Sequence, residues 1–147
     1  MNQNAILTRP PVWFWLVGLL GLVWFAMGLF QFVLAMKATT EGLIAQGFTP
    51  EQVSANLGMP GWKRLCWGVG VVAGVAGCVL LLLRLKQAVW LLLVGLISGV
   101  IMFFGDWAIG FFSIFGAFMI GLSSAVVVTA LLMWWFARWA ERRKILK

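Results

Sequence analysis

Residues 65–105 read LCWGVGVVAGVAGCVLLLLRLKQAVWLLLVGLISGVIMFFG, two apolar runs separated only by Arg84, Leu85 and Lys86. Each run, 65–83 and 87–105, has about the 20 residues that a helix needs to cross the hydrocarbon of a bilayer. A three-residue link permits only a tight antiparallel connection between two helices. This stretch therefore predicts a helical hairpin that crosses a membrane twice.

Two further apolar runs, 11–36 and 109–137, flank the hairpin. The first would cover about 39 Å as a helix, and it is longer than the apolar core of about 7–15 residues in a cleaved signal peptide. We therefore expect an uncleaved first helix. The predicted fold class is an all-α membrane protein, a four-transmembrane-helix antiparallel bundle forming a single membrane domain over 1–147.

The composition excludes a soluble domain. Hydrophobic residues make up 63% of the chain and charged residues 10%, against about 45–50% and about 25% in soluble domains. The net charge of +7 does not indicate nucleic acid, because the basic residues flank the apolar runs and form no stripe on a polar surface.

The basic residues predict the orientation. Cytoplasmic loops carry the excess of Lys and Arg, and here one side of the predicted membrane holds most of them, so we expect both termini in the cytoplasm. Residues 138–147 form a basic cytoplasmic tail, interpreted as a topology anchor, with docking to a partner or lipid as the alternative. The majority side carries Arg9, Arg84, Lys86, Arg138, Arg142, Arg143, Lys144 and Lys147, and the other side Lys37, Lys63 and Arg64.

The outer loop, 37–64, is the one sizeable polar segment. Thr49, Pro50 and Gln52 have the spacing of a capping box with proline at the first helical position, which predicts a short helix at 50–57. We expect the first membrane helix to continue past the bilayer toward Gly47, where glycine can cap it. The loop is interpreted as structural, with a lid or partner-docking element as the alternative.

Glycines and other small residues recur on one face of each of the three later apolar runs, 65–83, 87–105 and 109–137. Because lipid is as apolar as the side chains, membrane helices associate through close contact, which small residues permit. These faces either pack inside one bundle, or one of them drives homo-oligomerisation or docks a partner's helix. Gly74→Leu distinguishes the two, because it disrupts folding if its face is internal and association if it is outward. The predicted packing residues are Gly70, Gly74, Gly77, Gly95, Gly99 and Gly121.

The polar candidates within or beside the membrane are few. We expect Gln31 to bond a neighbouring helix and Ser98, Ser123 and Ser124 to bond the backbone or another helix, with contact to a solute as the alternative. Asp106 is interpreted as an interfacial turn residue that pairs with Lys63 or Arg64. Cation or solute recognition is its alternative role.

Chemistry-bearing groups are scarce. The four runs contain no His, Tyr, Asp, Glu, Lys or Arg, and the chain contains no His at all. Cys66 and Cys78 lie twelve residues apart on one helix, about 18 Å, and cannot bridge each other. No nucleophile–base pair, metal cluster or phosphate loop is recognisable, so we expect no catalytic, cofactor or metal site and no enzyme activity.

Several apolar motifs resemble those of a family of small bacterial four-pass inner-membrane proteins often labelled "sugar transporter". The motifs are the opening Val12-Trp13-Phe14-Trp15 with Gly28, the outer-loop helix, 74–78 (GVAGC) leading into 81–84 (LLLR), and the closing 131–138 (LLMWWFAR) with its basic end. The resemblance spans nearly the whole chain. It implies the bacterial inner membrane and transport, but it identifies no binding residue here.

Two functions follow as hypotheses. The first is a non-enzymatic membrane protein that acts by helix–helix association, as an accessory or structural subunit. The second is a small-solute transporter, which would need an oligomer because hydrogen-bonding side chains are few. The expected partners are membrane lipid, further copies of the chain or other membrane subunits. A water-filled cavity at the level of Ser98 and Ser124 would favour transport.

Overall fold

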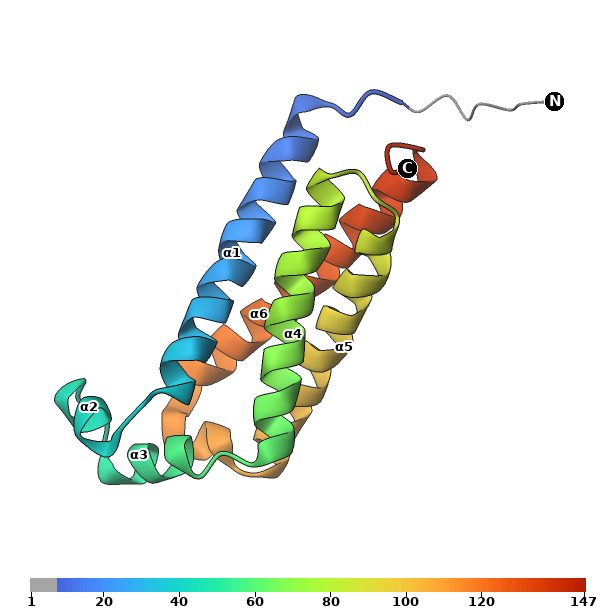
Figure 1. Ribbon diagram of the computed structural model, residues 1–147. Helices are drawn as coiled ribbons and strands as arrows, with labels where there is room; N and C mark the ends of the chain where they lie inside the picture. Colours follow the sequence, from blue (N-terminus) through green and yellow to red (C-terminus); the bar gives the residue numbers. More distant parts are fainter. Residues whose placement is uncertain (1–7) are drawn as a thin grey trace.

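The structure is a computed structural model that describes residues 8–147, and its regular elements there are helices (Figure 1). Four of them are long and apolar enough to cross a membrane, which confirms the predicted all-α bundle. These are α1 (Val12–Met36), α4 (Gly61–Leu82), α5 (Gln87–Ala108) and α6 (Phe111–Arg142). Two short helices, α2 (Thr40–Ala45) and α3 (Pro50–Leu57), lie between α1 and α4.

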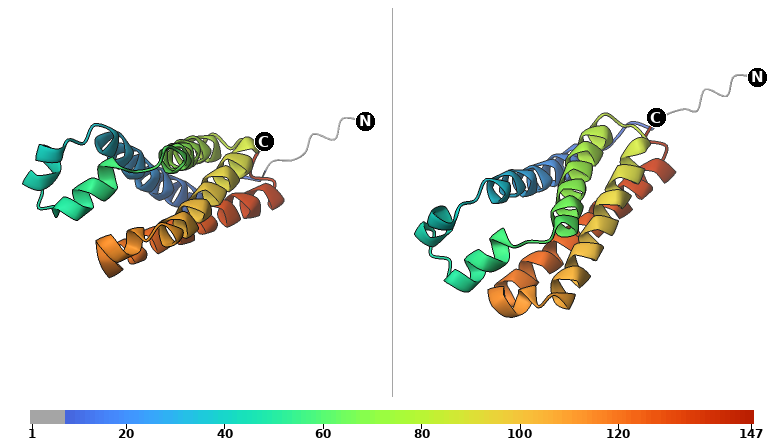
Figure 2. Two further views of the ribbon diagram at one scale, coloured as in Figure 1. Left: turned by 90° about the horizontal axis from the view of Figure 1, so that it is seen from below. Right: turned by 60° about the horizontal axis from the view of Figure 1, so that its bottom comes forward.

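The long helices pack in the order α1, α4, α5, α6, each antiparallel to the one before it. The beginning of α1 and the C-terminus lie at one end of the bundle, and α2 and α3 lie at the other (Figure 1). We name these the inner end and the outer end. Seen from the outer end, the end of α1 and the beginning of α6 lie apart (Figure 2).

The α4–α5 hairpin turns at Arg84, which adopts a φ of 63°. The Leu85 amide donates to the Leu80 carbonyl at 2.8 Å, and the Arg84 amide donates to the Leu81 carbonyl at 2.9 Å. This is the bonding pattern of a Schellman motif, in which the residue after the helix adopts the αL conformation. The Arg84 side chain then donates to the carbonyls of Ile145 and Thr8. A non-glycine residue is thus held in this conformation by hydrogen bonds to both ends of the described chain.

The outer loop contains two helices where the sequence predicts one. The predicted α3 is present with its complete capping box between Thr49 and Gln52. The expected continuation of α1 toward Gly47 is wrong, because α1 ends at Met36 and Thr39 caps a separate helix by accepting from the Gly42 amide. Gly47, at a φ of 87°, ends α2 instead.

Three boundaries near the outer end also differ from the predicted 65, 105 and 109, because α4 begins at Gly61, α5 ends at Ala108 and α6 begins at Phe111. Lys63 is therefore helical, and Asp106 lies in the last turn of α5 and not in the connection. The turn is made by Gly110, at a φ of 71°. Charged residues can remain in these helices because Lys63 and Asp106 neutralise each other, as described below.

The predicted span 109–137 is interrupted near its start. Gly116 has a φ of 74° and a ψ of −170°, which breaks the helical path inside α6. Only glycine adopts this region without strain. The helix then runs without a break to Arg142, five residues beyond the predicted end at 137.

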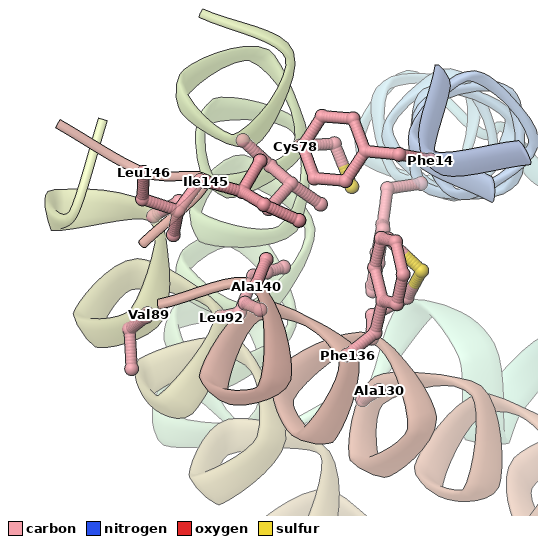
Figure 3. Close-up of a cluster of buried hydrophobic side chains, with 14 residues drawn as sticks. Phe14, Cys78, Val89, Leu92, Ala130, Phe136, Ala140, Ile145 and Leu146 are labelled. Carbon is pink, nitrogen blue, oxygen red and sulfur yellow. The ribbon is translucent and has the colours of Figure 1, made fainter. Parts of the chain in front are cut away.

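The inner half of the bundle holds the main hydrophobic core (Figure 3). Phe14, Cys78, Leu81 and Ala137 are fully buried there. The basic tail predicted at 138–147 is continuous with the bundle. Residues 138–142 extend α6, and the last residues fold back so that Ile145 and Leu146 are buried in the core, because their apolar side chains complete it.

Candidate functional site

The outer half of the bundle contains a partly open cavity of about 380 Å³. Side chains from α1, α3, α4, α5 and α6 line it, and most of them are apolar or aromatic. Its polar lining is confined to a few groups, namely Gln31, Asn56, Lys63, Ser98, Asp106 and Ser123. We call this space the lower chamber, because it lies deeper in the bundle than a second chamber at the outer surface.

The chamber exists because α1 and α6 meet only in the inner half. There the Phe14 and Phe136 rings lie 5.6 Å apart between centroids, and Met133 of α6 packs against Gly21 of α1. In the outer half the outer loop contacts α6 instead, through the Gln52 side-chain amide of α3, which donates to the Ile114 carbonyl at 3.4 Å, and through the Phe48–Phe115 ring pair. The core therefore closes the chamber toward the inner end.

A buried ion pair lies at the outer end of this chamber. Lys63 Nζ of α4 is 2.5 Å from Asp106 Oδ1 of α5, and the two residues are only 2% and 5% exposed. At this distance the ammonium and the carboxylate are held together by charge attraction. Lys63 Nζ also lies 3.3 Å from the centroid of the Phe111 ring, a cation–π contact that joins α6 to the same cluster.

The structure brings most of the predicted polar residues together. Gln31, Ser98, Asp106 and Ser123 all line the lower chamber, and Asp106 pairs with Lys63, one of its two expected partners. Ser124 does not line the chamber. Its hydroxyl donates to the Ile120 carbonyl at 2.8 Å, which is the expected bond to the backbone. The cavity thus lies at the level of Ser98 and Ser123, and its walls are mainly apolar.

Sequence reasoning did not include three lining residues that matter. These are Lys63, predicted only as a flanking charge and as one of two partners of Asp106, and Asn56 and Trp67, for which the sequence predicts no role at a cavity. For Lys63 a signal existed, because it lies in a helix directly before an apolar run and an acid follows the next run. No comparable signal identifies Asn56, whose position depends on how α3 packs.

A second chamber of about 470 Å³ lies at the outer surface, between the end of α1 and the α2–α3 segment. Its lining is more polar and includes Lys37, Thr39, Gln46 and Asn56. We call it the upper chamber. Gln31, Phe48, Asn56 and Trp67 line both chambers, so the two spaces adjoin.

The glycine faces of α4 and α5 are internal. A Cβ on Gly74 would overlap the Phe25 ring, one on Gly77 would lie 2.8 Å from Leu92 Cγ, and one on Gly70 would lie 3.2 Å from Ser98 Cβ. A Cβ on Gly95 would lie 3.4 Å from the Gly70 carbonyl oxygen. These four glycines allow close helix approach, so of the two outcomes for Gly74→Leu, disrupted folding is the one expected.

The other two predicted packing glycines differ. A Cβ on Gly99 would meet only Val127, at 3.8 Å, and Gly99 lines the lower chamber. A Cβ on Gly121 would have no neighbour within 4 Å, and Gly121 is exposed. Within the described chain Gly121 therefore does not pack against another helix, and its predicted role inside the bundle is wrong.

The described residues contain no group of three His, Cys, Asp or Glu side chains placed to hold a metal ion. Cys66 and Cys78 are both free thiols. The described side chains that line the chambers offer apolar contact, a few hydrogen-bonding groups and the charge of Lys37.

No family model, no curated protein and no solved structure matches this chain. The fold and the chambers rest on the sequence and the structure, and the chain is an integral membrane protein with four candidate spans.

Proposed function

We propose that this chain is a non-enzymatic accessory or structural subunit of the bacterial inner membrane, which acts by associating with further membrane helices through the outward face of α6. The observation that carries the proposal is the environment of Gly121. It is the one predicted packing glycine in the membrane spans whose added Cβ would meet nothing within the described chain.

The surroundings of Gly121 suit a helix contact. Ala117, one turn before it, is also exposed, and Phe118 beside it is 79% exposed. The Ser124 hydroxyl on the same side is bonded to its own helix and therefore presents no unpaired donor to lipid. Small residues four positions apart let two backbones approach closely, which is the main source of helix association in lipid.

The proposed orientation places the inner end in the cytoplasm. Thr8, Arg84 and Arg143 lie together there, since Arg84 donates to the Thr8 carbonyl and the Thr8 hydroxyl donates to the Arg143 carbonyl. The majority of the basic residues flank this end, as the positive-inside rule requires of a cytoplasmic face.

A second candidate function is binding or transport of a small solute, and the lower chamber favours it. About 380 Å³ is within the range of about 300–1,000 Å³ typical of small-molecule sites. A transport cycle would require the core around Phe14 and Phe136 to open, because it closes the chamber toward the inner end.

Substitution of Gly121 tests the association. Gly121→Leu adds a branched side chain where no described neighbour would be displaced, so the bundle should fold normally while close helix approach is blocked. Wild-type protein purified in mild detergent and then placed in nanodiscs should give a discrete oligomer or complex by light scattering and cross-linking. Gly121→Leu should give the single chain.

The matched control is Ala26→Leu, which enlarges an exposed residue on α1 that lines neither chamber. This variant should retain the complex. If wild-type protein is a single chain under every mild condition, or if Gly121→Leu associates as well as wild type does, association through α6 is wrong.

A further inference from the structure

We infer that the two adjoining chambers together bind a single-chain amphiphile with an anionic headgroup, its tail in the lower chamber and its head in the upper chamber. This site lies on the opposite side of α6 from Gly121 and does not depend on association through that face. Phe115, Met119 and Leu122 of α6 line the lower chamber, whereas Gly121 does not.

The lower chamber suits an apolar chain. Its walls are built mainly from Trp24, Phe25, Met102, Phe103 and Met119 and similar side chains. Its two charged residues neutralise each other, because Lys63 is paired with Asp106 and covered by Phe111. The chamber therefore offers no unpaired charge to a ligand. The part of the ligand that lies in it should be uncharged, because burying an unpaired charge is costly.

Because α1 and α6 do not pack together in the outer half, the lower chamber faces the surrounding bilayer between these two helices. An acyl or alkyl chain is the apolar group that this environment supplies.

The upper chamber suits a polar head of negative charge. Lys37, at the end of α1, is the only charged residue that lines it, and it forms no ion pair with any residue of the described chain. The exposed amide of Gln46 can donate a hydrogen bond, whereas the Thr39 hydroxyl already accepts from the Gly42 amide. Gln31 and Asn56, at the junction, can bond the atoms that link head to tail.

Photo-cross-linking in zwitterionic nanodiscs tests the site. The probes are a 12-carbon carboxylate with a diazirine at its chain end and the corresponding 12-carbon alcohol. The carboxylate should label lower-chamber residues saturably, as mapped by peptide mass spectrometry. Unlabelled dodecanoate and dodecyl phosphate should both compete, and a two-chain anionic phospholipid should compete poorly.

Two variants address the two chambers separately. Gly99→Leu fills the lower chamber, and its Cβ makes only an ordinary 3.8 Å contact with Val127, so it should fold and should lower labelling by both probes at least about tenfold. Lys37→Gln removes the charge at the head and should weaken carboxylate binding by about tenfold while leaving the alcohol unchanged.

The matched controls lie outside both chambers. Ala26→Leu should leave labelling unchanged, as should Lys86→Gln, which removes an exposed lysine at the inner end. Thermal unfolding of each variant verifies that it is folded. The inference is overturned by labelling that does not saturate, by equal labelling of folded Gly99→Leu and wild type, or by a carboxylate affinity that Lys37→Gln leaves unchanged.

Discussion

At the scale of single residues, the buried pair of Lys63 and Asp106 is the most consequential feature outside the core. Two ionised groups at 2% and 5% exposure lose nearly all contact with water, and each is stabilised chiefly by the other. The pair joins the first turn of α4 to the last turn of α5, and the Phe111 ring over Lys63 adds the start of α6. It therefore holds the outer ends of three helices together.

Removing one partner should be costly. Asp106→Asn leaves the Lys63 ammonium buried without a counterion, and we expect a loss of about 3–5 kcal/mol in the free energy of unfolding. Lys63→Met should cost a similar amount, whereas Lys63→Met combined with Asp106→Leu should recover most of the loss. Reversible unfolding of nanodisc- or micelle-held protein measures all three, and equal stability of Asp106→Asn and wild type would contradict the ionised pair.

At the scale of the elements, the break in α6 directs the outer end of this helix. Gly116 interrupts the helical path between the Phe111–Phe115 segment, whose two rings stack at 4.3 Å, and the long remainder of α6. The first segment thereby reaches Phe48 and Gln52 of the outer loop, while the remainder packs on α5. The outer wall of the lower chamber depends on this change of direction.

Gly116→Ala tests the break. A Cβ there would meet no atom within 4 Å, so the cost is that of the backbone conformation alone, about 1–3 kcal/mol of lost stability. Gly121→Ala, in the helical part of the same element, should instead stabilise by about 0.5–1 kcal/mol. The comparison uses chemical unfolding of both variants, and a Gly116→Ala protein as stable as wild type would show that α6 is continuous.

At the scale of the whole molecule, the inner half of the bundle is tightly packed, whereas the outer half contains the chambers. The inner half is closed by the core and by the last residues, where the Lys147 amide donates to the Arg84 carbonyl at 2.5 Å and the Lys86 amide donates to Lys147 at 3.2 Å. The outer half contains the Lys63–Asp106 ion pair, the outer-loop helices and both chambers. Any ligand-dependent movement is therefore expected at the outer end.

The orientation of the whole chain can be measured with single cysteines in a Cys66→Ala, Cys78→Ala background. Ser54→Cys places an exposed thiol on α3, and Lys86→Cys places one at the inner end. A membrane-impermeant maleimide should label Ser54→Cys in cells with a permeabilised outer membrane, and Lys86→Cys only after lysis. The reverse pattern would place both termini outside the cytoplasm and contradict the orientation assigned from the basic residues.

The class of the protein was readable from the chain because transfer into lipid is a property of each segment. Length and apolarity predict four spans, and the Thr49–Gln52 capping box is a local motif, so both are present as expected. The hairpin at Arg84 follows from the shortness of its link. None of these requires knowledge of which helix lies beside which.

The candidate site was decided by packing. The sequence predicts Lys63 or Arg64 as the partner of Asp106, whereas the packing of α4 on α5 selects Lys63 and buries the pair. Packing also turns the glycines of α4 and α5 inward, while Gly121 faces outward. The lower chamber exists because α1 and α6 meet at the inner end and separate at the outer end. Such arrangements depend on contacts between distant residues, which hydropathy and spacing along one chain do not encode.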